Sequence, residues 1–242
     1  MSRTLVIGDI HGGLKALEQV LERARVTQND ILIFLGDFVD GWNDTPKVVD
    51  FLIELDKTHT CIFIRGNHEE MVLRWLSEGE DNEEWRLHGG QSTVEVYQSV
   101  HDEIKKHHIE FLSRLNDYHL DSKNRLFVHA GFTNLKGVEY EYFKGMYCWD
   151  RTLWEAALSM DKTLSKKDLF YPKRFALYEE IFIGHTPVTR IGYSVPVNRA
   201  NVWNVDTGAA FKGRLTIMDV DTKEFWQSKP LPELYPNENG RN

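Results

Sequence analysis

The sequence predicts an α/β fold with a largely parallel sheet. Three short apolar runs, TLVIG at 4–8, ILIFL at 31–35 and CIFI at 61–64, have the length and composition of buried strands. Between them lie segments with apolar residues at helical spacing, one over 14–24 and one that begins at Pro46. Strands that alternate with helices pair in parallel, because each helix returns the chain to the same end of the sheet.

The rest of the chain is expected to add helices first and strands afterwards. Helices are predicted at 69–77 and, as one long element, at about 93–115, followed by an aromatic region of loops and helices. The later strands are predicted at 125–129, 181–184, 201–205, 215–220 and 225–227. We expect one domain over residues 1–229 and a loosely ordered tail over 230–242, where three prolines occur.

Composition and charge exclude several classes of protein. Of 242 residues, 41% are hydrophobic and 27% charged, which is typical of a globular chain rather than a disordered one. The net charge of −8 argues against a nucleic-acid partner, since such binding requires a basic patch. The absence of a long apolar segment or leader pattern, together with only two cysteines, predicts a cytoplasmic protein without a membrane partner.

Polar side chains follow five of the predicted strands, each beside a glycine. In chain order they are Asp9 and His11, Asp37 and Asp40, Asn67 and His68, His129, and His185. Taken singly, each has a structural explanation as a helix cap, a turn residue or a hydrogen-bonded core histidine. Taken together they indicate one site, because ligands bind at the carboxyl ends of strands in open α/β sheets.

Aspartate, histidine and asparagine ligands suit divalent ions such as Mn²⁺, Fe²⁺ or Zn²⁺. More than four candidate ligands are available, which favours two ions over one. Asp37 is central in the set and is the natural bridge between ions about 3.5–4 Å apart, an arrangement that holds the oxygens of phosphate esters.

Five ordered motifs carry a family resemblance that covers roughly residues 4–219. They are GDIHG (8–12), GDFVDG (36–41), RGNHE (65–69), VHAG (128–131) and GHTP (184–187). The chain resembles the calcineurin-like metallophosphoesterases, and within them the phosphoprotein phosphatase branch, which includes bacterial and phage serine/threonine phosphatases and symmetrical diadenosine tetraphosphatases. The resemblance implies a four-layer αββα sandwich of two mixed sheets with a dimetal site at the strand ends.

The same resemblance implies a role for each motif residue. Asp9 and His11 would hold the first ion, Asp37 would bridge, and Asn67, His129 and His185 would complete the second. Mn²⁺ is the expected metal, with Fe²⁺ and Zn²⁺ as alternatives. A metal-bridging water would be the nucleophile, and Asn67 would also contact the substrate phosphate.

His68 and Asp40 would form the acid and its orienting carboxylate. An alkoxide leaving group is poor, so a proton donor is worth about 10²–10⁴ in rate. By the resemblance, His68 would protonate the leaving oxygen and Asp40 would hold the His68 ring.

The chain departs from the family pattern at Gly41, where an arginine usually completes the motif. An arginine there would grip the substrate phosphate through two hydrogen bonds. Arg151, in CWDR at 148–151, is one candidate replacement, although a surface arginine at a helix start explains it as well. Trp42 and Asn43 are candidates for lining the space of the missing side chain.

Three functions remain open from the sequence. The first is hydrolysis of phosphoserine or phosphothreonine in proteins, and the second is hydrolysis of a diadenosine polyphosphate or other nucleotide. The third is a weakly active metal-binding regulatory protein, against which the intact His68–Asp40 pair argues. The expected partner is thus a phosphoprotein or a small phosphate ester, and the sequence leaves the oligomeric state open.

Overall fold

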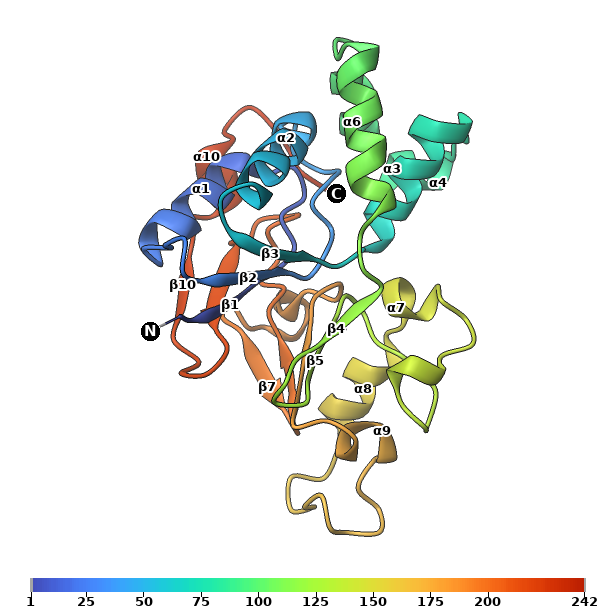
Figure 1. Cartoon of the computed structure of the whole chain (residues 1–242), viewed down its shortest axis with the longest axis vertical. Coiled ribbons are helices and arrows are strands. Elements are labelled where there is room, and N and C mark those ends of the chain that lie inside the picture. The colour runs from blue at the N-terminus through green and yellow to red at the C-terminus, as the bar shows by residue number, and fades with distance from the viewer. Residues whose placement is uncertain (1, 242) are drawn as a thin grey trace.

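Two mixed five-stranded sheets form the centre of the protein, described by a computed structural model for residues 2–241 (Figure 1). In spatial order, the first sheet contains β10 (Phe225–Gln227), β9 (Thr216–Asp219), β1 (Thr4–Ile7), β2 (Ile31–Phe34) and β3 (Thr60–Phe63). The second contains β4 (Tyr118–Leu120), β5 (Arg125–Val128), β6 (Glu180–Ile183), β8 (Val202–Asn204) and β7 (Val197–Arg199). Strands β1, β2 and β3 pair in parallel, as do β5, β6 and β8. The edges β10, β4 and β7 are antiparallel to their neighbours.

The alternation of side chains along the strands explains why the two sheets pack face to face. Val6 of β1 and Ile33 of β2 belong to one buried cluster with Phe127 and Phe182 of the second sheet, and the two phenylalanine rings stack at 4.9 Å. The intervening residues of each strand point to the opposite face, where helices cover them. Both faces of both sheets are therefore buried, and the predicted four-layer αββα sandwich is confirmed.

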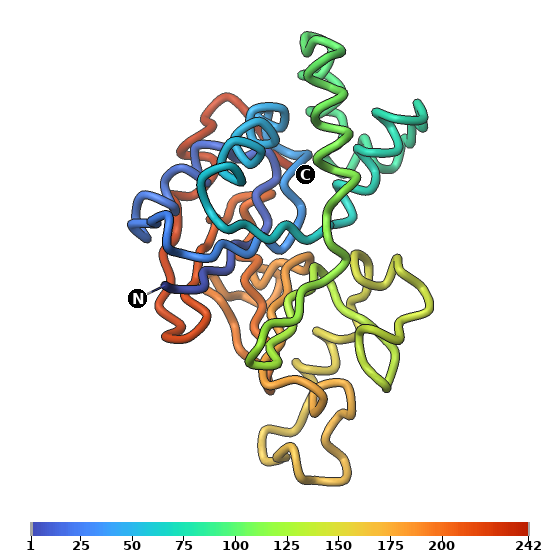
Figure 2. The backbone as a smooth tube through the Cα atoms, in the orientation of Figure 1, coloured from blue at the N-terminus to red at the C-terminus, as the bar shows by residue number. Residues whose placement is uncertain are grey.

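Helices cover the two outer faces unequally. The first sheet and its flank carry α1 (Leu14–Arg23), α2 (Thr45–Asp56), α3 (Asn67–Glu78), α4 (Glu83–Trp85), α5 (Gln91–Tyr97), α6 (Asp102–Ser113) and α10 (Leu231–Leu234). The second carries the short helices α7 (Met146–Trp149), α8 (Thr152–Ser159) and α9 (Lys173–Ala176). Figure 2 shows α3 and α6 extending away from the sheets. Within residues 2–241, no helix combines the length and apolarity needed to cross a bilayer.

The long helix expected at 93–115 is in fact two helices, α5 and α6, separated by a turn at 98–101. The hydroxyl of Tyr97 lies 2.8 Å from Nδ1 of His108, and both side chains are buried. In a continuous helix these residues would be about 16 Å apart along the axis. The break therefore lets the chain fold back and bury this polar pair.

The segment after residue 229 packs against the first sheet layer, in contrast to the loose tail expected there. Leu231 is fully buried within the apolar cluster that covers α1, and Tyr235 stacks on Trp42 with ring centroids 5.2 Å apart. Trp42 is itself buried and donates its indole N–H to the carbonyl of Ala209 at 2.8 Å. Trp42 is thus a core residue that anchors this segment and does not line the site.

Candidate active site

The loops that follow the parallel strands of both sheets meet at one edge of the sandwich. The loop after β1 contacts the loop after β6, where the His185 amide donates to Oδ2 of Asp9 at 3.0 Å. The first residue of α3, which follows β3, contacts the residue after β5, where Oδ1 of Asn67 lies 3.2 Å from Nε2 of His129. Side chains far apart in the sequence are brought together in this way, as expected for strand ends.

The backbone at this edge adopts conformations that few residues tolerate. Four candidate ligand or acid–base residues have positive φ: His11 (50°), Asp37 (52°), Asp40 (68°) and His185 (65°). Such conformations cluster at functional sites, where the surrounding structure enforces them. The neighbouring glycines allow close approach, because a Cβ on Gly66 would overlap Oδ1 of Asp37 and one on Gly184 would overlap Oδ1 of Asp9.

Two groups of side chains could each hold a metal ion, and Asp37 belongs to both. The first consists of His11, Asp37 and His68, and the second of Asp37, His129 and His185. Within each group the potential ligand atoms lie within 4.8 Å of one another. Asp37, which the sequence predicts as the bridge between two ions, is the residue common to both groups.

The hydrogen bonds of His129 leave a lone pair aimed at other acceptors. Its Nδ1 lies 2.8 Å from the carbonyl of Leu35, which can only accept, so Nδ1 carries a hydrogen, and in the neutral ring, favoured by burial, Nε2 does not. Nε2 then faces Oδ1 of Asp37 at 3.4 Å and Oδ1 of Asn67 at 3.2 Å. Three acceptors that face one another repel unless a cation lies between them, so the residues present fit a divalent metal.

Asp9 lies beside these groups with one oxygen unused. Oδ1 of Asp9 is buried and has no hydrogen-bond partner within residues 2–241. Burial, together with the charges of Asp206 and Asp37, raises the pKa of Asp9 well above its usual range. A cation would relieve both the desolvation and the repulsion, so this orphaned oxygen also fits a metal ligand.

Burial lowers the pKa of three histidines of the site, His11, His129 and His185, which favours their neutral form. Burial lowers the pKa of His11 to about 4, although Asp37 opposes the shift. Burial also lowers the pKa of His129, and for His185 burial and the neighbouring His129 place the pKa well below its usual range. Neutral imidazoles with free lone pairs are the form that binds metal ions.

His68 and Asp40 form a buried pair next to the first group. Nδ1 of His68 lies 2.6 Å from Oδ2 of Asp40, and both side chains are at most 1% exposed. The Asp40 carboxylate also accepts from the indole N–H of Trp85 at 2.6 Å and the hydroxyl of Thr93 at 2.5 Å. This network fixes the His68 ring with Nδ1 as donor, which leaves Nε2 as the atom that can exchange a proton.

Glu69 holds the turn that carries Asp37. Its carboxylate accepts from the backbone amides of Asp37 (2.7 Å), Phe38 (2.6 Å), Val39 (3.2 Å) and Gly66 (2.8 Å). Burial and the charge of Asp37 raise the pKa of Glu69 to about 8. The residue links the ends of β2 and β3, and fixes the position from which Asp37 reaches both groups.

A pocket of about 520 Å³ opens beside the ligand groups. Its lining includes Asn67, His68 and His185, the aromatic residues Trp85, Trp149 and Phe211, and the arginines Arg74, Arg151, Arg190 and Arg241. The predicted candidate Arg151 points into it, with Nε 3.4 Å from Nε2 of His185. The pocket thus combines positive charge, aromatic surface and the candidate metal ligands.

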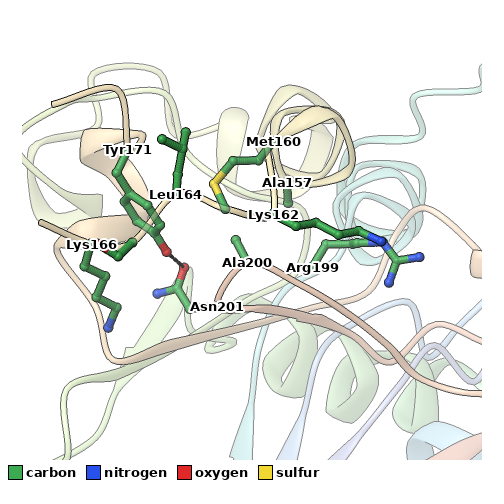
Figure 3. A pocket seen from close by; sticks show the side chains of 10 residues that line it. Ala157, Met160, Lys162, Leu164, Lys166, Tyr171, Arg199, Ala200 and Asn201 are labelled. Carbon is green, nitrogen blue, oxygen red and sulfur yellow. Dashed lines mark hydrogen bonds between the residues drawn. The ribbon is translucent and has the colours of Figure 1, made fainter. Parts of the chain in front are cut away.

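Another hollow lies between the loop after α8 and the hairpin of β7 and β8 (Figure 3). Two of its cations are engaged in local contacts: Lys166 donates to the carbonyls of Tyr178 and Glu179, and Arg199 lies over the ring of Tyr193. None of the candidate ligands lines this hollow. The candidate residues Asn67, His68 and His185 line the pocket beside Asp37 instead.

Comparison with known proteins identifies the family of the chain. Residues 2–211 match the family described as calcineurin-like phosphoesterase. The chain belongs to this family. The predicted metallophosphoesterase resemblance and the prediction of a hydrolase are thereby confirmed, and the family is one that depends on two metal ions.

Relatives of this calcineurin-like phosphoesterase carry two kinds of name. A bis(5'-nucleosyl)-tetraphosphatase [asymmetrical], PrpE, of Oceanobacillus iheyensis is 28% identical over 235 residues, which cover 91% of this chain and 89% of the relative. Serine/threonine-protein phosphatase 1 of Salmonella typhimurium is 26% identical over 215 residues, 88% of this chain and 89% of the relative. A crystal structure titled as a putative diadenosine tetraphosphatase shares the fold with a TM-score of 0.63 and 19% identity, covering 93% of this chain and 92% of its own.

Several residues of the site were not singled out from the sequence. Asp206 is buried, follows β8, and has its pKa raised to about 7, mainly by burial. It occurs in WNVDTGA, a strand followed by aspartate near a glycine, and so repeats the pattern of the other strand ends. Trp85 and Thr93 lie in a helical region without such a pattern, and no local signal connects them to Asp40.

Proposed function

We propose that this chain hydrolyses a phosphate ester at a centre of two divalent ions, most readily Mn²⁺, with a dinucleoside polyphosphate as substrate. Asp9, His11 and Asp37 would hold one ion, and Asp37, Asn67, His129 and His185 the other. When bound, the ions would supply an activated water nucleophile and offset charge on the phosphate. Fe²⁺ and Zn²⁺ suit the same ligands and are the alternatives.

The chain's own residues would carry the proton and hold the substrate. Nε2 of His68 would protonate the leaving oxygen, because Nδ1 is engaged with Asp40. Asp40 would stabilise the charged imidazole and keep its orientation, in turn held by Trp85 and Thr93. Asn67 and Arg151 would contact the phosphate from the side of His185.

The number of arginines in the pocket is the observation that favours a polyphosphate substrate. A single phosphate can be held by one or two guanidinium groups, whereas this pocket is lined by four, those of Arg74, Arg151, Arg190 and Arg241. Arg74 is paired with Glu70, which leaves three guanidinium groups around the ligand groups. That charge suits a polyphosphate chain. Trp149, half exposed at 46%, offers a surface on which a base can stack.

Hydrolysis of phosphoserine or phosphothreonine in proteins is the second candidate. It is favoured by the similarity to the Salmonella typhimurium serine/threonine-protein phosphatase over 88% of the chain. The two substrate classes share the metal centre and the acid, so they differ only in what surrounds the phosphate.

A substrate panel at one Mn²⁺ concentration tests the proposal. We expect kcat/KM for diadenosine tetraphosphate to exceed that for a phosphothreonine peptide. ATP and AMP as products would indicate asymmetrical cleavage, and two ADP would indicate symmetrical cleavage. A higher kcat/KM for the peptide would establish the phosphatase instead. No turnover of any ester would leave the metal-binding regulatory protein as the function.

A pair of variants tests the base-stacking surface separately. Trp149→Ala should raise KM for the dinucleotide by about 5- to 150-fold, because stacking of one base contributes about 1–3 kcal/mol. KM for a small ester without a base should stay unchanged. Tyr142→Ala is the matched control, since Tyr142 is 88% exposed and does not line the pocket.

A further inference from the structure

The space beside Gly41, where the family pattern usually has an arginine side chain, is occupied in this protein by the side chain of Arg241. A Cβ at Gly41 would lie 3.3 Å from Cγ of Arg241, and one at Gly89 would lie 2.7 Å from the same atom. The Gly41 amide donates to the Gly89 carbonyl at 3.0 Å. The two glycines thus form a floor on which the aliphatic part of Arg241 lies. Both have positive φ, 95° and 111°, which suits residues without a side chain.

The segment that carries Arg241 is anchored along the loop after β2 (Figure 2). Tyr235 stacks on Trp42, and its hydroxyl donates to Oδ2 of Asp44 at 2.8 Å. Glu238 accepts from the Asn43 amide at 2.9 Å, and the Arg241 amide donates to the Ala210 carbonyl at 2.8 Å. These contacts determine where the Arg241 side chain begins.

The guanidinium of Arg241 reaches the candidate metal ligands and keeps a buried N–H donor without a partner among residues 2–241. Nη1 lies 3.4 Å from Nε2 of His11, and the group lies 5.4 Å from the ring centroid of Phe211. Nε is buried and has no hydrogen-bond partner within residues 2–241. A guanidinium has five N–H donors and no acceptor, so donors left over beside this site indicate an anionic ligand.

We propose that Arg241 is the arginine that grips the substrate phosphate, in place of the side chain missing at Gly41. This rests on the proposed function, since it names a further substrate-binding residue of that site. Arg241 approaches from the side of His11 and Arg151 from the side of His185, so the phosphate would lie between two guanidinium groups. Two N–H groups of Arg241 would donate to two phosphate oxygens.

Binding of inorganic phosphate to Mn²⁺-loaded protein tests this directly, by calorimetry and independently of turnover. We expect Arg241→Ala to weaken phosphate binding at least about tenfold, since charge-assisted hydrogen bonds are lost. Arg241→Lys should bind phosphate with an affinity between those of the unmodified chain and Arg241→Ala, because lysine keeps the charge but cannot donate two parallel hydrogen bonds. The bound Mn²⁺, measured by mass spectrometry, should be unchanged in both.

Two control variants separate a phosphate contact from a packing effect. Asn237→Ala changes an exposed residue of the same segment that makes none of these anchoring contacts, and Arg199→Ala removes an arginine that lines a different hollow. Both should bind phosphate as the unmodified chain does. Unchanged phosphate binding in Arg241→Ala would overturn the proposal, and so would loss of Mn²⁺ together with phosphate. If no ester is hydrolysed, the proposed function fails, yet the phosphate titration still decides the role of Arg241.

Discussion

Nδ1 of His68 and Oδ2 of Asp40 lie 2.6 Å apart, and both groups are shielded from solvent. The pair comes from the ends of two neighbouring strands, β2 and β3. Two further donors, from Trp85 and Thr93, hold the carboxylate, so three side chains determine the orientation of the imidazole. This network yields predictions for catalysis that are separable from predictions for metal binding.

His68→Asn should lower kcat by about 10²–10⁴ while two metal ions remain bound. Asparagine keeps a polar side chain of similar reach but cannot donate a proton to the leaving oxygen. The measurement combines steady-state kinetics with metal analysis of the same preparation.

Metal analysis is decisive here because His68 also belongs to a group of potential ligands, with His11 and Asp37. A variant that has lost an ion along with its activity would show that His68 is a ligand and not the acid. A substrate with an activated leaving group supplies the control, since it should be hydrolysed almost normally by His68→Asn.

Thr93→Val should lower kcat roughly tenfold without raising KM. This is the lower end of the effect seen when a residue that hydrogen-bonds to an active-site group is removed. The Thr93 hydroxyl donates to Oδ1 of Asp40 at 2.5 Å, and valine leaves that oxygen without a donor. Because Thr93 is fully buried, the free energy of unfolding should also fall by about 1–3 kcal/mol. Kinetics and chemical denaturation measure the two effects.

Thr93→Ser is the matched variant, since it keeps the hydroxyl and removes only a methyl group. It should retain most of kcat. Equal losses in the serine and valine variants would mean that packing, and not the hydrogen bond to Asp40, explains the effect.

Mn²⁺ should raise the melting temperature of the metal-free protein. The site gathers four buried carboxylates, those of Asp9, Asp37, Glu69 and Asp206, and a cation offsets their repulsion. At a free concentration about 100 times Kd the gain is about 2.7 kcal/mol per ion. For a chain of this length that corresponds to roughly 5–10 °C per ion, measurable by calorimetry.

Asp37→Asn should remove most of that shift, because Asp37 belongs to both potential ligand groups. A shift of the same size in the variant would locate the stabilising ion elsewhere in the chain. Mg²⁺ at the same concentration is a useful comparison, since a histidine-rich site should favour Mn²⁺.

The residues at the strand ends could be predicted from the sequence because their placement depends on local patterns. An apolar run identifies a strand, and the residue after it then lies at a known edge of a parallel sheet. Asp9, Asp37 and His129 follow this rule. Asp206 follows the same rule and could also have been predicted from the sequence.

Arg241 could not be predicted, because no local pattern connects it with Gly41, two hundred positions earlier. Its position depends on how Leu231 and Tyr235 pack against the first layer, which is a property of the folded core. The break between α5 and α6 was missed for a similar reason. The buried pair of Tyr97 and His108 forms only when the chain folds back, and helical periodicity alone does not detect it.

Asp30→Asn should destabilise the protein in a pH-dependent way that is independent of the metal site. The buried Asp30 carboxylate accepts from the guanidinium of Arg3 at 2.7 Å and from the amide of Thr27 at 2.9 Å. The hydrogen bonds from Arg3 hold the pKa of Asp30 well below its usual range, although burial opposes the shift. A depressed folded-state pKa contributes stability above the unfolded value of about 3.9, and this contribution is lost as the pH falls toward the folded value. Asp30→Asn should therefore be less stable than the unmodified chain at pH 7, by about 1–3 kcal/mol in chemical denaturation. The difference should shrink below about pH 4.

Asp81→Asn is the control for this prediction. It removes an exposed carboxylate paired with Arg86 and should leave the melting temperature unchanged at pH 7 and at pH 3, since exposed pairs contribute little. If the loss of unfolding free energy in Asp30→Asn stays constant from pH 7 to pH 3, then the shape of the Asp30 side chain, and not its charge, stabilises the start of β2.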